Sequence, residues 1–417
     1  MKSSRYSRRD FGRIAAALGT AAILPNRLLA GDDALVTISS PWGEDKPFQK
    51  VVDAYNARKT GVTVVNRFDG DYQAMATKAL SSIAAGRAPE LMVTGWKFGY
   101  FARRTLGARD FRDIDAAKAQ ALMAQFRSSL APLVSIDDAL IGMPWSLSTP
   151  VTWINMDLWR AAGLDPEFPI DISHGWLMEQ AGKLDKALAG KHPTYRSAID
   201  LSNNEWTSQA YIQNAGGFIL RGDRIACDSP EAIRGITAFA EPARKGLWTN
   251  MDYRAQTNAL LGGNIAVVTT SSSLAGVASK ADAEIRDVMF PSLDGHRNMN
   301  SGGNFLAIYA RNDEQALAAM DFLAFCASVE GMSIWSEMGY LNPSVHDLGP
   351  KPLQQAANAQ LEAGLTAETI WPGKRGLEGQ KVWRDWVSRV VQGAAEPAQA
   401  MAAMAQAKVE LAPLLAA

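Results

Sequence analysis

The chain of 417 residues is poor in cysteine and histidine and lacks a long apolar run. Its two cysteines, Cys227 and Cys326, are too few for a disulfide framework, and the sequence leaves open whether they pair. A membrane-spanning helix needs about 20 consecutive apolar residues. The apolar run near the N-terminus, residues 14–25, is shorter than that. These shortages exclude a disulfide-stapled domain and an integral membrane protein.

Motifs of common catalytic sites are also missing. The four histidines are far apart and form no H-E-x-x-H or Cys/His pair, so a catalytic zinc site has little support. No G-x-S-x-G elbow occurs, and no G-x-G-x-x-G or phosphate-binding loop follows a strand. We therefore expect no cofactor and no metal, and a protein that binds its ligand without turnover.

Residues 1–30 have the pattern of an export signal. Arg8 and Arg9, followed by Phe11, match the twin-arginine type, and a short apolar stretch leads to a small residue, Ala30, where we expect cleavage. The alternative is a disordered basic tail. Without this segment the chain has 36 basic and 42 acidic residues, a net charge of −6, and no basic run. Nucleic acid is therefore not an expected partner.

The remaining chain has the composition of a soluble globular protein, with 47% hydrophobic and 20% charged residues, and its length predicts about two domains. Strands and helices alternate along its first part. The order is strand, helix, strand, helix, strand, over residues 34–40, 47–61, 62–68, 72–88 and 90–95. Such alternation predicts a parallel sheet that is covered by helices on both faces.

Aromatic and charged residues follow each of these strands. Trp42 and Glu44 come after the first strand, Tyr72 after the second, and Trp96 and Lys97 after the third. Because ligands of α/β sheets bind beyond the carboxyl ends of the strands, these loops predict a binding site. The alternative for any single residue is ordinary loop polarity.

Later segments continue the strand and helix pattern. Residues 264–270 are predicted to be a strand that leads into a serine-rich helix start, and residues 313–338 a long helix. Two glycines, Gly302 and Gly303, precede another strand, where the backbone must approach something closely. Residues 397–411 form an Ala-rich helical segment.

The stretch "MPWSLSTPVTWINMDLWRAAGLDP", residues 143–166, carries a family resemblance. It resembles the extracellular solute-binding proteins of ABC importers, in the group that takes sugars, oligosaccharides and glycerol phosphates. The motifs "SIAAGRAPELM", "VVTTSSSLAG", "SGGNFLAIYA", "WSEMGYLNPS" and "KRGLEGQKVWRDWV" resemble that group in the same order along the chain.

The resemblance implies an α/β fold of two lobes, each a doubly wound sheet, with the ligand in the cleft between them. It places residues 31–148 and 299–344 in the first lobe and residues 151–296 and 347–417 in the second. Ser148 then lies where the chain crosses between lobes and faces the ligand; the alternative is that Ser148 and Thr149 merely cap a turn. Pro150 would stiffen the crossing.

The resemblance also implies further ligand-binding residues. Either Arg375 or Arg384 would pair with an anion, and Ser272 is preferred among the three serines 271–273. The whole predicted set is Trp42, Glu44, Tyr72, Trp96, Trp145, Ser148, Trp206, Ser272, Gly303, Tyr340, Arg375 and Arg384. One position departs from the glycerol-phosphate branch: Trp96 or Lys97 stands where that branch has a carboxylate, which puts glycerol phosphate in doubt.

The implied function is a periplasmic receptor, expected as a monomer, that captures a small polyhydroxylated ligand and delivers it to the importer permease by lobe closure. The ligand could be a neutral sugar or an anionic derivative. One alternative is an exported carbohydrate- or phosphoester-hydrolysing enzyme, which would need two carboxylates or a metal in the cleft. Another is delivery of the bound form to a chemosensor.

Overall fold

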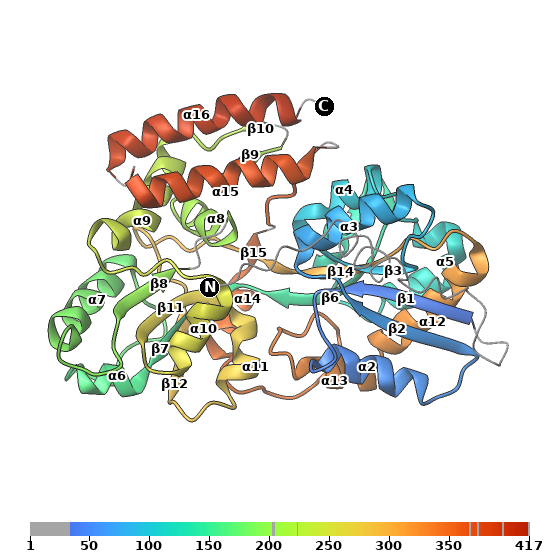
Figure 1. Ribbon diagram of the computed structural model, residues 1–417, viewed down its shortest axis with the longest axis horizontal. Coiled ribbons are helices and arrows are strands. Elements are labelled where there is room, and N and C mark those ends of the chain that lie inside the picture. Colours follow the sequence, from blue (N-terminus) through green and yellow to red (C-terminus); the bar gives the residue numbers. More distant parts are fainter. Residues whose placement is uncertain are drawn as a thin grey trace, which may run out of the picture.

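The computed structural model describes residues 34–201, 205–222, 224–366, 368–372, 375–393 and 396–415. Two lobes lie side by side, each built on its own sheet, and the predicted signal segment 1–30 lies outside the described residues (Figure 1). The chain passes between the lobes more than once, so neither lobe is continuous in sequence.

The first lobe contains a five-stranded sheet in the order β2-β1-β3-β14-β6. Strand β1 pairs in parallel with β2 and β3, as the alternating sequence predicts, whereas β14 runs antiparallel to both β3 and β6. The sheet is therefore mixed, because β14 and β6 arrive from distant parts of the chain. The strands are β1 (Ala34–Ser40), β2 (Val62–Phe68), β3 (Leu91–Gly95), β6 (Met143–Ser148) and β14 (Gly302–Ile308).

The second lobe contains a four-stranded sheet in the order β12-β7-β11-β8. Only β11 and β8 pair in parallel among these described strands, so this sheet departs from a doubly wound parallel arrangement. The strands are β7 (Pro150–Asn155), β8 (Ser197–Leu201), β11 (Ile265–Ser271) and β12 (Ile285–Met289). Short paired strands complete the set: β4 (Ser135–Ile136), β5 (Ala139–Leu140), β9 (Leu220–Arg221), β10 (Arg224–Ile225), β13 (Met299–Asn300) and β15 (Leu365–Thr366).

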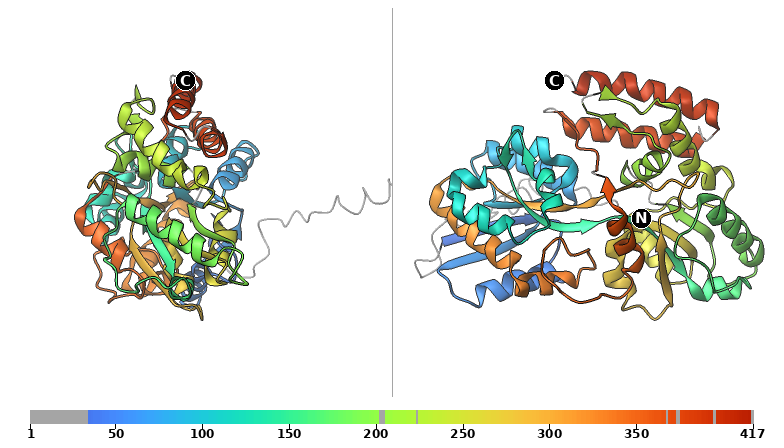
Figure 2. Two further views of the ribbon diagram at one scale, coloured as in Figure 1. Left: turned by 90° about the vertical axis from the view of Figure 1, so that its left-hand side faces the viewer. Right: turned by 180° about the vertical axis from the view of Figure 1, so that it is seen from behind.

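Helices surround each sheet. The first lobe has α2 (Pro47–Asn56), α3 (Tyr72–Ala84), α4 (Gly99–Arg104), α5 (Phe111–Met123), α12 (Asp313–Ala327) and α13 (Val329–Ser336), with 3-10 turns η1 (Trp96–Phe98) and η2 (Ser128–Leu133). The second has α6 (Met156–Ala161), α7 (His174–Leu188), α8 (Glu205–Asn214), α9 (Pro230–Arg244), α10 (Tyr253–Leu261), η3 (Ser272–Leu274), α11 (Ala275–Ala278), α14 (Gln355–Ala363), α15 (Gly376–Gly393) and α16 (Pro397–Leu415). The last two helices pack together against α9 and form an outer layer of this lobe (Figure 2).

The predicted long helix over 313–338 is wrong, because two helices lie there and meet at 68°. Ser328 has an extended backbone, and its hydroxyl accepts a hydrogen bond from the Gly331 amide, so it caps α13 and starts a new helix. Within the described residues, no single helix has the length and apolar character of a membrane span; only the bent pair α12 and α13, taken together, reaches them.

The two cysteines do not pair. Cys227 is buried in the core of the second lobe and Cys326, on α12, in the core of the first. Burial raises the pKa of the Cys227 thiol to about 12 and that of Cys326 well above its ordinary value. Both thiols therefore behave as small apolar core groups.

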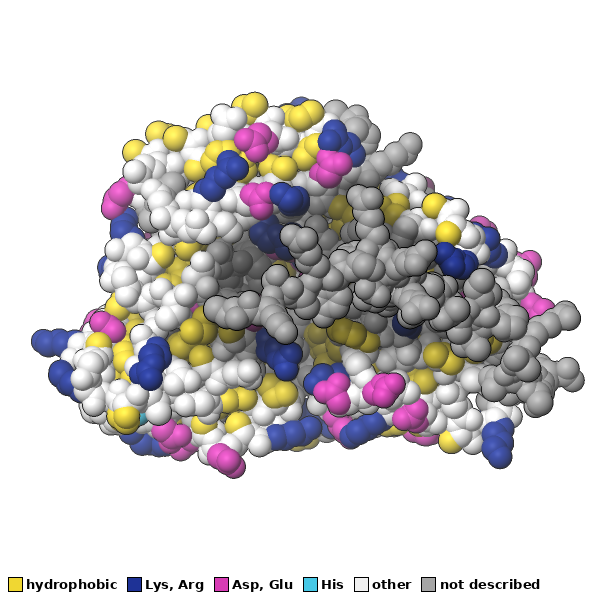
Figure 3. All heavy atoms as spheres, in the orientation of Figure 1, with side chains coloured by type: hydrophobic (Ala, Val, Ile, Leu, Met, Phe, Trp, Pro, Cys, Tyr) yellow, Lys and Arg dark blue, Asp and Glu magenta, His cyan; other side chains and the backbone are white. Residues whose placement is uncertain are grey.

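On the face of the molecule drawn in Figure 3, basic and acidic side chains are interspersed over both lobes. This face has no large field of one charge, which fits the nearly balanced composition of the chain.

The crossing between the lobes is centred on Thr149, which joins β6 to β7 and is fully buried. Its amide donates to Ser272 Oγ at 3.2 Å, and the Ser272 amide donates to the Thr149 carbonyl at 2.9 Å. The Thr149 hydroxyl donates to the Asn300 carbonyl at 3.3 Å and accepts from Gln360 Nε2 at 3.1 Å. Three distant segments therefore meet at one residue.

Replacing Gln360 should test how much this joint contributes to stability. Its Nε2 also donates to the Pro150 carbonyl at 2.8 Å, and its Oε1 accepts from the Phe290 amide at 2.6 Å. Gln360→Ala strands these buried groups, and we expect it to lower the free energy of unfolding by about 2–4 kcal/mol in a urea titration followed by tryptophan fluorescence. Gln355→Ala, on the exposed side of the same helix, is the control. Equal stability of the two variants would contradict this role.

Candidate functional site

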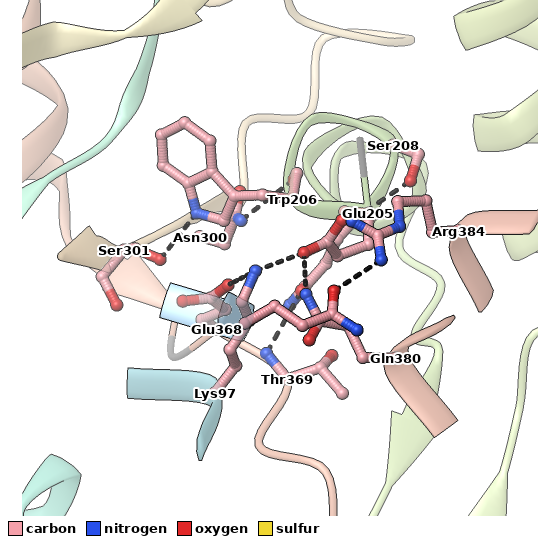
Figure 4. A network of polar contacts seen from close by, with 12 residues as sticks. Lys97, Glu205, Trp206, Ser208, Asn300, Ser301, Glu368, Thr369, Gln380 and Arg384 are labelled. Atoms are coloured by element: carbon pink, nitrogen blue, oxygen red, sulfur yellow. Dashed lines mark hydrogen bonds and ion pairs between the residues drawn. The ribbon is translucent and has the colours of Figure 1, made fainter. Parts of the chain in front are cut away.

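A buried ionic cluster joins the two lobes (Figure 4). Lys97, in the turn after β3 of the first lobe, pairs with Glu205 at the start of α8 in the second, and Glu368 Oε1 lies 4.0 Å from the same ammonium. The three side chains are 15%, 9% and 7% exposed, so bulk water is largely excluded. Gln380, on α15, donates a further hydrogen bond to Glu205.

The charges in this cluster shift one another's pKa values. Burial acts to lower the pKa of Lys97, but attraction to Glu205 and Glu368 outweighs it and the pKa is raised. Burial acts to raise the pKa of Glu205, but Lys97 outweighs it and the pKa is lowered. For Glu368, burial and repulsion by Glu205 prevail over Lys97 and raise the pKa to about 7. Lys97 and Glu205 are thus a charged pair, while Glu368 titrates near neutrality.

Two more hydrogen bonds cross the lobe boundary close to this cluster. Arg384, on α15, donates from Nη2 to Gln73 Oε1 on α3 at 2.6 Å. The Trp371 amide, from the segment before α15, donates to the Lys97 carbonyl at 3.3 Å. The guanidinium of Arg384 is half-buried and is bonded here to a neutral amide. It therefore retains donors that could bind an anion.

Trp206 lies beside the ionic cluster and is partly exposed (Figure 4). Its indole Nε1 donates to the Ser301 carbonyl at 3.1 Å, and its own carbonyl accepts from Asn300 Nδ2 at 3.1 Å. A Cβ on Gly302 would lie 2.5 Å from the indole ring, so this position must be glycine for the ring to pack here. Gly303 has φ +131°, and a Cβ there would lie 2.0 Å from the Ser146 carbonyl. The close approach predicted for these glycines is thus to the protein itself.

A hydroxyl network forms a second part of the lobe boundary. The Tyr72 phenol accepts from Asn304 Nδ2 at 2.8 Å and is hydrogen-bonded to Tyr340, which is in turn bonded to Ser273. Burial raises the pKa of Tyr72 to about 12 and that of Tyr340 well above its ordinary value, so both remain neutral. Tyr72, Tyr340 and one of the three serines therefore come together as the sequence predicts, but that serine is Ser273.

Three predicted tryptophans lie in the core of the first lobe. Trp42 and Trp145 both pack on Trp335, with ring centroids at 4.7 Å, and they are 7% and 0% exposed. Trp96 is 0% exposed and stacks on Phe305 at 5.8 Å. All three indoles are therefore packed against other aromatic side chains inside the first lobe.

The other predicted residues are dispersed. Ser148 is buried opposite Gly302, at the end of β6, and Ser272 is fully buried, where its hydroxyl bonds Thr149. The Ser272 hydroxyl is therefore engaged at the crossing between the lobes. Glu44 is exposed in the loop after β1. Arg375, just before α15, is also exposed and pairs with Glu378 in the first turn of that helix.

Sequence reasoning did not find Glu205, Glu368, Gln380 or Gln73. Each of them meets a partner more than 100 residues away in the chain. Only an indirect signal was available in the sequence. Lys97 stands close to the position after β3 where the resemblance implies a carboxylate, and a buried lysine needs an acidic partner from another part of the chain.

Several buried polar atoms around the boundary lack a hydrogen-bond partner in the described part of the chain. They are Trp96 Nε1, Asn300 Oδ1, Ser301 Oγ, Gln209 Nε2 and Gln380 Oε1. Such atoms have capacity for a polar ligand or for water. In the same ranges no group of three His, Cys, Asp or Glu side chains is placed to hold a metal ion. The arrangement suits hydrogen bonding and stacking.

A surface cavity of about 460 Å³ lies elsewhere, beside the segment 342–361 that returns from the first lobe to the second. Its lining includes Arg127, His346, Lys351 and, at one side, Tyr340. Arg127 and Lys351 are exposed, so this cavity lacks the buried charges of the lobe boundary. The boundary is therefore the stronger candidate site.

The chain is similar in sequence to periplasmic binding proteins. The chain is 25% identical over 362 residues to the sn-glycerol-3-phosphate-binding periplasmic protein UgpB of Escherichia coli O6:K15:H31 (strain 536 / UPEC), covering 82% of this chain and 79% of the relative. UgpB of strain K12 is 25% identical over 335 residues, covering 75% and 76%.

Solved structures confirm the two-lobed fold. The ABC substrate-binding protein Lmo0181 of Listeria monocytogenes, in complex with cycloalternan, has a TM-score of 0.79 at 17% identity, and UgpB of Mycobacterium tuberculosis, in complex with glycerophosphocholine, has 0.78 at 19%. Each comparison covers 91% of this chain and 98% of the other. A family model for bacterial extracellular solute-binding proteins matches residues 50–363. Since that match spans well over half of its length, the chain belongs to the bacterial extracellular solute-binding protein family.

Proposed function

We propose that this solute-binding protein captures a small polyhydroxylated ligand between its two lobes and delivers it to an ABC importer. The family consists of binding proteins rather than enzymes. One observation carries the choice of site: a partly exposed tryptophan, a tyrosine pair and a buried ionic cluster meet at the same lobe boundary. Aromatic rings stack on the apolar faces of sugars, while hydroxyls and amides bind their OH groups.

The ligand-binding residues that we propose are those that lie at the boundary. Trp206 would form the wall on the second lobe, and Tyr72 and Tyr340 the wall opposite. The unpartnered atoms of Ser301 and Asn300, next to Trp206, would accept hydrogen bonds from ligand hydroxyls. This choice retains Trp206, Tyr72, Tyr340 and Arg384 from the predicted set and replaces Ser272 by Ser273.

The lobe boundaries, export and partner are part of the same proposal. Residues 31–148 with 299–344 and residues 151–296 with 347–417 would move as two bodies about the crossing at Thr149. Closure of hinged lobes shields a ligand from water and presents a new shape to a permease. The protein would act as a monomer in the periplasm, after export by the twin-arginine route. The relatives named UgpB are periplasmic proteins, which supports this location.

A thermal-shift screen should identify the ligand class. The panel comprises neutral sugars, polyols, sugar acids, glycerol phosphates and sulfosugars, with glycerophosphocholine added because one structural neighbour binds it. A ligand at about 100 times its dissociation constant adds about 2.7 kcal/mol to the stability of the folded state. We expect a raised Tm with at least one class. Turnover of a glycoside or phosphoester in the same panel would instead favour a hydrolase.

Substitution of Arg384 should report whether the ligand is anionic. Arg384 reaches the lobe boundary, whereas Arg375 is exposed and already paired. For an anionic ligand we expect Arg384→Ala to weaken binding by roughly 2–5 kcal/mol, because it removes a charge-assisted bond. Arg384→Lys should recover part of that loss, since lysine lacks the planar fork. Calorimetry would measure all variants, with Arg375→Ala as the control, and full affinity in Arg384→Ala would indicate a neutral ligand.

Trp206→Ala should weaken binding whether or not the ligand is charged. Stacking and apolar contact with one indole contribute about 1–3 kcal/mol, and neither depends on ligand charge. Trp386→Ala is the matched control, because Trp386 is a partly exposed indole of the same lobe that bonds Glu410 on α16. Unchanged affinity in a folded Trp206→Ala variant would mean that the second-lobe wall lies elsewhere.

A further inference from the structure

The ion pairs of Lys97 differ from the others in this molecule. Within the described ranges, every other ion pair joins two groups of the same lobe, as Lys50 and Glu337 do in the first lobe. Most of those pairs are well exposed, whereas Lys97, Glu205 and Glu368 are between 7% and 15% exposed. Exposed pairs contribute little to stability, while removing one member of a buried pair leaves an uncompensated charge. Separation of the two lobes would therefore remove Lys97 from Glu205 and Glu368.

Glu205 is also held in place by contacts within the second lobe. Gln380 donates to Glu205, and Glu205 begins α8, so two contacts within the second lobe hold this carboxylate. Lys97 lies in the turn Trp96–Phe98 that follows β3, and its carbonyl accepts from the Trp371 amide of the other lobe. Both the side chain and the backbone of Lys97 thus contact the second lobe, which gives the contact a defined geometry.

We propose that Lys97 is a lobe-positioning residue, whose ion pair with Glu205 holds the two lobes together before a ligand binds. This inference rests on the two-lobed binding function proposed above and concerns how that site is controlled. A ligand that contacts both lobes then meets a protein that is already partly closed. The apparent affinity for a ligand is proportional to the fraction of the protein that is in the binding-competent state, so a larger closed fraction raises the affinity.

Glu368 should make closure depend on pH, because burial and the charge of Glu205 disfavour its ionised form. The pKa of Glu368 is about 7 with the lobes together, whereas a carboxyl in water titrates near 4.3. The closed state thus binds more protons than the open state between these values, so closure should strengthen as pH falls from 8 towards 5. The other titratable groups that interact with Glu368 are Lys97, Glu205 and Tyr72, and the charge of Arg384 acts on Lys97. Lys97, Glu205 and Tyr72 do not titrate in this window, because the pKa is lowered for Glu205, raised for Lys97 and about 12 for Tyr72.

Small-angle scattering of the purified ligand-free chain would test this positioning role. We expect Lys97→Met to shift the radius of gyration upward at pH 7, because the side chain keeps its length but loses its charge. Glu205→Gln is a second variant with less change in shape. The double variant Lys97→Glu with Glu205→Lys exchanges the charges and should return the radius of gyration to the wild-type value. The control is Lys381→Met, which removes an exposed α15 lysine paired with Asp385 of the same helix.

The outcomes are distinct. An unchanged radius of gyration in both folded single variants, checked by circular dichroism, overturns the proposal. Opening in the single variants without restoration in the exchanged one also overturns it, because lost packing would then explain the effect. A pH titration gives an independent reading: the wild type should become more compact from pH 8 to 6, and Glu368→Gln should lose that dependence. A wild type with no pH response contradicts the part assigned to Glu368.

Failure of this proposal can be separated from failure of the binding function. If the single variants keep the wild-type radius of gyration but a panel sugar still raises their Tm, the binding function stands and the positioning role falls. If no compound of the panel raises Tm but Lys97→Met opens the lobes and the charge exchange closes them, the positioning role stands on its own.

Discussion

Thr149 is held by hydrogen bonds from three separate parts of the chain, and the placement of both lobes depends on this joint. Its backbone bonds Ser272 in both directions, and its hydroxyl bonds the Asn300 carbonyl and the Gln360 amide. Asn300 lies just before β14 returns to the first sheet, and Gln360 belongs to the helix that follows the last return. The hinge motion that we propose would take place about this joint, because β6 of the first sheet and β7 of the second meet there. The boundary with Trp206 and the ionic cluster lies between the two lobes that this joint connects.

Much of the fold could be predicted because its signals are local. The first strand is confirmed at both ends, as β1 (Ala34–Ser40). On α2 the apolar residues Phe48, Val51, Val52 and Tyr55 recur at the spacing of one helix face, and all four are buried. Asp71 accepts from the Ala74 amide and caps α3. The family resemblance supplied what local signals lack, namely that the chain forms two lobes. It did not reveal the antiparallel pairs of the second sheet or the bend at Ser328.

The candidate site was less predictable, because its partners come together only in three dimensions. Tyr72 and Tyr340 are 268 positions apart and were matched through motifs, not through any rule of spacing. Trp42 was a candidate because it follows a strand end, and Trp145 because of the family resemblance, yet tertiary packing buries both in the core. The sequence showed that Lys97 departs from the glycerol-phosphate branch, but it did not identify the acidic partners of this lysine. Glu205 and Glu368 belong to no local motif that would predict their contact with Lys97.

Each lobe encloses one free thiol, Cys227 in the second and Cys326 in the first, and both are fully buried with raised pKa values. The reactive species of a cysteine is the thiolate, which these two sites suppress. A cysteine newly placed on the surface would consequently react with maleimide or nitroxide reagents far faster than either native one. The unaltered sequence is thus a ready background for attaching one spectroscopic label to each lobe.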